Sequence, residues 1–322
     1  MGALRELSVD QQVSLLFAML FGVLTLASVV FFLRTLRDGP PAQMEVNARR
    51  RRDLQAVWFG ASVFWLAWVT GGVVATLLFA LLSFLALREY ITLMHTTRAD
   101  HRSLLLAFFV VLPVQFVLAG SQFLDLFTVF VPVYVFLAIP VMSALGNDPV
   151  RFLERTAKIQ WGVVVCVYGM SHAPALLLLD LPRYDGRGAF LVFYLVIVVA
   201  TAQLVQEAAA RRLRRRPVAR AISRSFSWYA WLAGALAAAL VGALLYWATP
   251  FKPVPAFVLG FMASASGTLG EFVMTALKRD AGVRSWGGKV SVTGAVGLLD
   301  RVAPLCFAAP VFFHAVRWYF RV

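Results

Sequence analysis

Long apolar runs, separated by short polar and basic stretches, dominate the pattern along this chain. A helix needs about 20 mostly apolar residues to cross a bilayer, whereas the strands of a membrane barrel alternate over shorter segments. The pattern therefore predicts an all-α fold, a polytopic integral membrane helical bundle with about ten transmembrane helices. The expected spans cover residues 13–33, 54–69, 71–87, 104–119, 125–145, 160–179, 188–206, 229–248, 255–276 and 304–320.

We expect these spans to form a single membrane domain over residues 1–322. Its N-terminal spans lie at about 13–145, and its C-terminal part lies at about 160–322. The stretch 54–87 is nearly continuous, and Thr70-Gly71-Gly72 is the turn expected to divide it; a single kinked helix is the alternative. No internal repeat is visible, so an inverted-repeat transporter gains no support from the pattern.

Composition agrees with a membrane protein and excludes a water-soluble globule. Hydrophobic residues make up 61% of the chain and charged residues 14%, and the mean hydropathy is +0.78. The net charge of +14 would suit nucleic acid, but the basic residues lie between apolar spans. Membrane topology and attraction to anionic lipid explain them better, so we expect membrane lipids and no nucleic acid as partners. The two cysteines lie inside apolar runs, which favours neither a disulfide nor a metal cluster.

The basic residues also predict which side each loop faces. With the N-terminus outside, 24 of the 30 basic residues fall in cytoplasmic loops and six fall outside. Such a bias is what the positive-inside rule requires of the correct orientation. It places the loop after residue 276 on the cytoplasmic side of the membrane.

Gly270 to Ala303 is the stretch where charge, glycine and carboxylate gather beside a membrane helix. Glu271 and Lys278 share one helical face, the run Lys278-Arg279-Asp280 ends the helix, and Asp300-Arg301 closes a glycine-punctuated loop. Two acids, several cations and a flexible backbone are the parts of a site for a metal-bound phosphate group. An ordinary cytoplasmic loop with solvated charges is the alternative.

Small residues at four-residue steps, Gly234, Ala238 and Gly242, mark one face of a later span. Small residues let two helices approach closely. We expect this face to contact either a neighbouring helix or a second subunit, which would make a homodimer.

The segment from Gly270 to Arg301 resembles the signature of the phosphatidate cytidylyltransferases, also called CDP-diacylglycerol synthases. Gly270-Glu271, Lys278-Arg279 and Leu299-Asp300-Arg301 match or nearly match the family's G-D, K-R and L-D-R elements, and residues 84–90 also look like a family segment. The resemblance implies an integral protein of a bacterial inner or plasma membrane. It would convert CTP and phosphatidate to CDP-diacylglycerol and pyrophosphate in phospholipid biosynthesis.

The resemblance also implies roles for individual residues. Asp300 and Lys278 would be catalytic, and Glu271 and Asp300 would bind Mg²⁺. Lys278, Arg279, Arg301 and Ser223 would hold the substrates, with Ser223 placed by an ungapped match to the family's S-P-G-K-T.

Several positions depart from the family pattern. The final aspartate of L-D-R-x-D is Ala303, the histidine and first glycine of the loop are Ala295 and Val296, and the lysine of S-P-G-K-T is Phe226. The K-D pair is Arg284-Ser285, and Gln203 stands where the family has an acidic position. A nearby acid, Glu207, is one helical turn after Gln203 and could substitute for it.

The sequence therefore leaves two main interpretations open. The chain is either a cytidylyltransferase that works with fewer acids, or a catalytically silent relative that binds an anionic lipid or a partner enzyme of lipid synthesis. A transporter or scaffold that shares only the composition is a third possibility.

Overall fold

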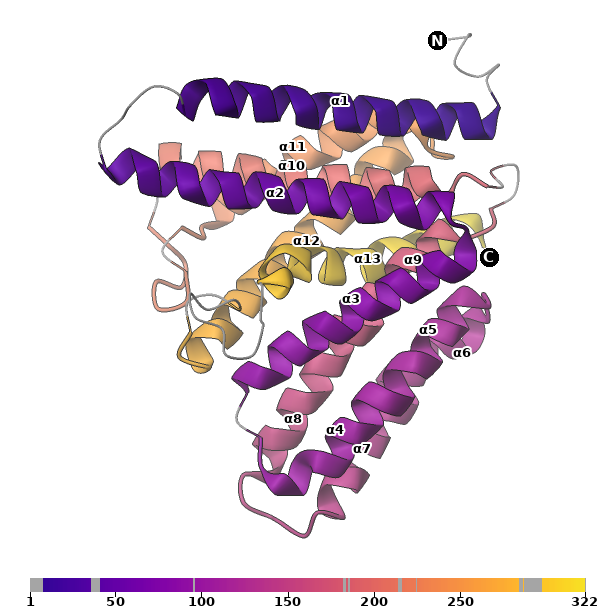
Figure 1. The fold of residues 1–322 in the computed structure, drawn as a ribbon, viewed down its shortest axis with the longest axis vertical. Coiled ribbons are helices and arrows are strands. Elements are labelled where there is room, and N and C mark those ends of the chain that lie inside the picture. Colours follow the sequence, from indigo (N-terminus) through magenta and orange to yellow (C-terminus); the bar gives the residue numbers. More distant parts are fainter. Residues whose placement is uncertain are drawn as a thin grey trace. The chain divides into compact units, whose positions relative to one another are not determined.

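A computed structural model describes residues 8–35, 41–94, 96–181, 184, 186–213, 216–223, 225–283, 286 and 297–321 (Figure 1). Within these residues every regular element is a helix. The chain forms two compact units, Met1–Ala75 and Thr76–Val322, and the division falls inside helix α3 (Gly72–Leu93). The single domain expected over residues 1–322 stays a prediction.

The first unit is built on a hairpin of two long helices, α1 (Val9–Thr35) and α2 (Pro41–Val69). Aromatic rings join them: Phe17 of α1 lies 5.0 Å from Phe64 and 5.7 Å from Trp68, centroid to centroid. Only the last part of α2, Val57–Val69, is apolar. The preceding polar residues continue the same helix, so α2 is longer than its hydropathy predicts.

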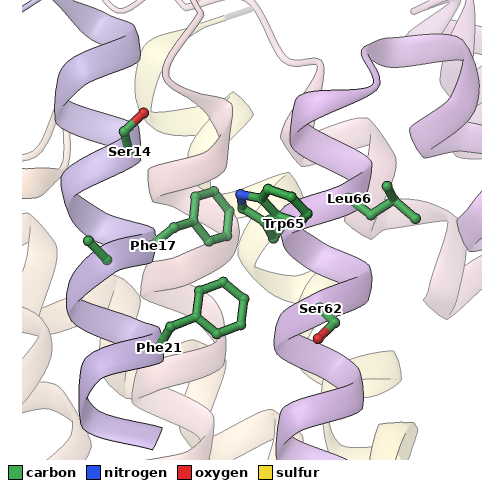
Figure 2. A pocket seen from close by; sticks show the side chains of 7 residues that line it. Ser14, Phe17, Phe21, Ser62, Trp65 and Leu66 are labelled. Atoms are coloured by element: carbon green, nitrogen blue, oxygen red, sulfur yellow. The ribbon is translucent and has the colours of Figure 1, made fainter. Parts of the chain in front are cut away.

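A cavity of about 540 Å³ opens between these two helices. Figure 2 shows Phe17 and Phe21 pointing from α1 toward α2, and Trp65 pointing back from α2. The walls of this cavity are mostly aromatic and aliphatic, and none of the predicted site residues lines it. The cavity therefore belongs to the packing of the hairpin.

Two of the next helical runs contain a π-helical turn beside a proline. The first run joins η1 (Arg98–Asp100), α4 (His101–Leu106), η2 (Ala107–Val111) and α5 (Leu112–Gly120); the second joins α6 (Leu124–Val129), η3 (Phe130–Val135) and α7 (Phe136–Ala144). Proline has no N–H to donate, so the carbonyl four residues earlier loses its α-helical partner. Pro113 follows η2 and Pro132 lies inside η3. Wider turns at these points accommodate the missing bonds.

A third run, made of α8 (Phe152–Gly162), η4 (Val163–Gly169) and α9 (Met170–Leu177), begins beside a buried ion cluster. The guanidinium of Arg155, 5% exposed, donates to Asp100 Oδ1 at 3.1 Å and to Asp148 Oδ2 at 3.0 Å. A buried charge is tolerated when it is paired and hydrogen-bonded in this way. The cluster ties the start of α8 to η1, which precedes α4, and to the loop that follows α7.

The remaining helices pack together as one group: α10 (Gly188–Leu213), α11 (Trp228–Leu244) with η5 (Leu245–Ala248), α12 (Pro253–Asp280) and α13 (Leu298–Phe320). The small-residue face of α11 packs against α10 of the same chain. A Cβ added at Gly234 would meet the carbonyl oxygen of Ala202 at 2.6 Å, and one at Gly242 would meet the Tyr194 hydroxyl at 2.5 Å. This face therefore serves contacts within the chain.

Eight helices in the described residues are long and apolar enough to cross a membrane. The prediction of a polytopic helical membrane protein is confirmed. Two of the ten expected spans are not among the eight. Residues 54–69 end α2 with a short apolar segment, and residues 160–179 lie within the α8–α9 run, whose first half carries charged side chains.

Candidate functional site

Helix α12 stops at the point where its basic residues occur. Gly282 adopts a left-handed conformation with φ +72°, which glycine reaches without strain. The Val283 N–H donates to the Lys278 carbonyl at 2.9 Å, and the Gly282 N–H donates to the Arg279 carbonyl at 3.1 Å. This is a Schellman arrangement. It fixes Lys278 and Arg279 in the last turn, where cations are favoured by the helix dipole.

Lys278 and Asp300 form the centre of the candidate site. Lys278 Nζ donates to Asp300 Oδ1 at 2.6 Å, and the backbone N–H of Trp286 donates to Asp300 Oδ2 at 2.9 Å. The side chains of Lys278 and Asp300 are 18% and 26% exposed, so the pair is covered but still accessible. Asp300 lies in the first turn of α13, an arrangement in which an acid is stabilised.

Glu271 has a different partner from Asp300. The Gln203 side-chain amide on α10 donates to Glu271 Oε2 at 2.9 Å. Glu271 precedes Lys278 by two helical turns, a rise of about 10 Å along α12. The two predicted carboxylates are thus held by two separate hydrogen-bonded pairs. Glu207, the substitute considered for Gln203, is exposed and lies 3.5 Å from Arg211 on its own helix.

The other predicted binding residues surround the end of α12. Arg279 Nε donates to the carbonyl of Ile222 at 3.5 Å, which brings the segment before α11 to this helix end. Ser223, the residue after Ile222, accepts the Phe226 N–H through its hydroxyl oxygen at 3.2 Å. Arg301 is exposed in the first turn of α13. These residues lie on three chain segments that meet near the pair of Lys278 and Asp300.

Two of the departures from the family pattern, Phe226 and Ala303, have buried surroundings, whereas Gln203 donates to Glu271. The Phe226 ring stacks on Phe272 with centroids 4.3 Å apart and an interplanar angle of 25°, and Phe226 is 3% exposed. Ala303 is also buried, one turn after Asp300. Residues 284–285, Ala295 and Val296 lie outside the described residues.

An ion-pair network connects α8 to the end of α12. Lys158 Nζ lies 2.7 Å from Glu154 Oε1 and 3.8 Å from Asp280 Oδ2. Hydrogen bonds from Arg151 and then Lys158 lower the pKa of the exposed Glu154 carboxyl to about 2. Glu154 therefore stays ionised down to that pH. The network helps to keep the end of α12 next to α8.

Sequence reasoning missed the contribution of α3 to this region. Glu89 accepts the Leu298 N–H through Oε2 at 3.1 Å, and Tyr90 packs on Trp286 with ring centroids 5.5 Å apart. Both residues belong to the family-like segment 84–90, which was the available signal. Nothing in the local pattern indicated that this segment contacts the start of α13.

Comparison with known sequences agrees with the geometry. The chain matches the cytidylyltransferase family over residues 50–319, which include every candidate site residue described above. The uncharacterized protein YnbB of Escherichia coli (strain K12) is 32% identical over 310 residues, which cover 94% of this chain and 97% of that protein. The relative gives no substrate, and the family match supports nucleotidyl transfer.

Proposed function

Because this chain belongs to the cytidylyltransferase family, we propose that it transfers a cytidylyl group from CTP to phosphatidate and releases pyrophosphate. The product would be CDP-diacylglycerol, an intermediate of phospholipid biosynthesis. The observation that carries the proposal is the covered but accessible pair of Lys278 and Asp300, at the end of a membrane helix and inside the matched residues.

The reaction needs charge neutralisation more than covalent chemistry from the protein. An oxygen of the phosphatidate phosphate attacks the α-phosphorus of CTP and forms a new P–O bond. The bond from that phosphorus to the oxygen bridging to the β-phosphate breaks, and pyrophosphate leaves with the electron pair. Lys278, Arg279 and Arg301 would hold phosphate oxygens, and Ser223 would add a hydroxyl donor. Asp300 would orient Lys278.

Magnesium is the expected cofactor, and it would neutralise phosphate charge when bound. Among the described residues no three His, Cys, Asp or Glu side chains gather as a metal site. Mg²⁺ often takes only one or two protein carboxylates, with phosphates and water supplying the other oxygens. The donor chemistry fits an ion that arrives with the nucleotide, and we propose Asp300 and Glu271 as its carboxylates, each from its own hydrogen-bonded pair and not from one shared cluster.

The site would face the cytoplasm, where nucleotides are available. The distribution of basic residues supports this orientation. We extend the proposal to a bacterial inner or plasma membrane on the family resemblance. A homodimer remains a proposal without support from α11, since its small-residue face contacts α10.

A catalytically silent relative is the second candidate function. It is favoured by the apolar stack of Phe226 on Phe272 where the family has a lysine, and by buried Ala303 where it has an aspartate. Such a protein would keep the basic end of α12 as a binding surface for an anionic lipid or a partner enzyme of lipid synthesis.

Product formation by the purified protein separates the two functions. With Mg²⁺, CTP and phosphatidate in detergent, we expect CDP-diacylglycerol from the natural protein. Removing one positioned charged group commonly costs a factor of about 100 or more, so Asp300→Ala should lose at least that much activity. Asp125→Ala is the control, because Asp125 is 96% exposed and lies at the other end of the bundle. No product above the Asp300→Ala level, with stabilisation by CTP retained, would support the silent relative instead.

A further inference from the structure

Glu89 is a carboxylate in an unusual position, since it is only 4% exposed in a helix whose residues are mostly apolar. Its Oε2 accepts the N–H of Leu298, the first residue of α13, at 3.1 Å. The first N–H groups of a helix have no partner inside the helix, and a carboxylate is well suited to accept them. Glu89 therefore caps α13 from a residue 209 positions earlier in the chain.

The next residue of α3 contacts the segment that follows α12. Tyr90 is fully buried, and its ring packs on the buried ring of Trp286. Close packing fixes Tyr90 in place, because a Cβ added at Gly162 of α8 would meet its ring at 2.7 Å. Two consecutive residues of α3 thus contact Trp286 and Leu298. Trp286 donates a hydrogen bond to Asp300, and Leu298 lies two residues before Asp300 in the chain.

Both contacts act on the same carboxylate. The N–H of Trp286 donates to Asp300 Oδ2, and Leu298 precedes Asp300 by two residues in the first turn of α13. Moving either one would move Asp300 relative to Lys278, which sits on a different helix. Lys278 Nζ lies 2.6 Å from Asp300 Oδ1, and such a movement would change that distance.

We propose that Glu89 is a positioning residue for Asp300, acting as the hydrogen-bond acceptor that sets where α13 begins. Its side chain supports the site through Leu298. The proposal rests on the proposed function only for its kinetic consequence. Its structural consequence, a looser pair of Lys278 and Asp300, can be measured without any turnover.

The reactivity of the Lys278 amine gives that independent measurement. An amine-reactive acylating reagent modifies lysines according to their access and pairing, and mass spectrometry of peptides quantifies each site. Lys158 is a matched internal control, because it is 19% exposed and ion-paired while Lys278 is 18% exposed and ion-paired. We expect Glu89→Leu to raise the rate at Lys278 several-fold and to leave the rate at Lys158 unchanged.

The variant Glu89→Gln tests whether Glu89 acts as a hydrogen-bond acceptor or through its negative charge. Glutamine keeps an oxygen that can accept the Leu298 N–H but removes the negative charge. The natural labelling ratio of Lys278 to Lys158 should return in this variant. If the enzyme is active, kcat should fall about 100-fold in Glu89→Leu and recover in Glu89→Gln. The KM for CTP should change little in either variant.

Three outcomes would overturn the proposal. Equal increases at Lys158 and Lys278 would mean that Glu89 stabilises the whole fold. Unchanged rates at both lysines in Glu89→Leu would mean that the contact does not position Asp300. A raised Mg²⁺ requirement in Glu89→Gln would make the carboxylate a metal ligand. Absence of turnover in the natural protein would count against the proposed function alone, because the labelling ratio still tests Glu89.

Discussion

Single residues decide whether this site keeps the charged groups of the family pattern. Gln203 replaces an acidic position, and its amide donates to Glu271 at 2.9 Å. An amide beside a carboxylate gives a stable neutral-to-charged hydrogen bond, whereas two carboxylates at that distance would repel each other unless a cation joined them. The substitution therefore removes a potential metal ligand and leaves Glu271 with a protein partner.

Gln203→Glu tests this account. We expect the variant to unfold at a lower temperature than the natural protein without divalent cations, because two carboxylates would share one small region. Millimolar Mg²⁺ should restore several degrees, because an ion that binds only the folded state stabilises it. Thermal unfolding in detergent with and without Mg²⁺ measures the difference. Gln55→Glu, at an exposed position of α2, should show no such response; an equal response there would contradict the account.

Phe226 is a second departure from the family pattern, and its ring has an apolar partner. Removing its ring leaves Phe272 without its stacking partner, and truncation of a buried phenylalanine costs about 3–5 kcal/mol. Phe226→Ala should therefore lower the unfolding temperature clearly. Phe59→Ala, at a position that is 56% exposed, should change it much less. Equal effects of the two substitutions would show that the stack does not support the fold.

At the scale of elements, the approach of α12 to α13 sets the geometry of the site. A Cβ at Gly270 would collide with the ring of Phe307 on α13. The two helices are antiparallel, so the Gly270 contact lies in the same interface as the Lys278–Asp300 pair. The glycine allows the helices to come close, and the acid and base are then within hydrogen-bonding distance.

Gly270→Ala should therefore separate the helices and reduce both stability and activity. The control is Gly22→Ala in α1, where an added Cβ meets nothing within 4 Å. Alanine is favoured over glycine inside a helix by about 1 kcal/mol, so the control should be neutral or slightly stabilised. Thermal unfolding and product formation measure both variants. Stabilisation of Gly270→Ala would mean that Phe307 moves aside without cost.

Local patterns predicted these elements better than their contacts. Hydropathy located α12 and α13, and the glycine after Lys278-Arg279-Asp280 indicated where α12 ends. The polar part of α2 was missed, because hydropathy detects the membrane segment and not the helix that continues beyond it. The contact between Glu89 and Leu298 was also missed, since it joins residues far apart in sequence and depends on how whole helices pack.

At the scale of the whole molecule, topology determines which substrates can reach the site. Arg151 belongs to the expected cytoplasmic side, and Lys252 belongs to the opposite side. Single cysteines at these exposed positions should report this, because Cys166 and Cys306 are buried. In intact cells a membrane-impermeant maleimide should label Lys252→Cys, and Arg151→Cys should be labelled only after permeabilisation. The reverse pattern would place the site outside and remove its access to CTP.

The cap that Glu89 provides also has a consequence for biogenesis. A ribosome completes α3 long before it begins α13. The contact between Glu89 and Leu298 therefore joins residues that are 209 positions apart in the chain. Contacts between distant residues form late, after the intervening helices have been inserted and packed. The Lys278–Asp300 pair should therefore be among the last parts of the molecule to take shape. Nascent chains would lack the candidate site until synthesis of α13 is complete.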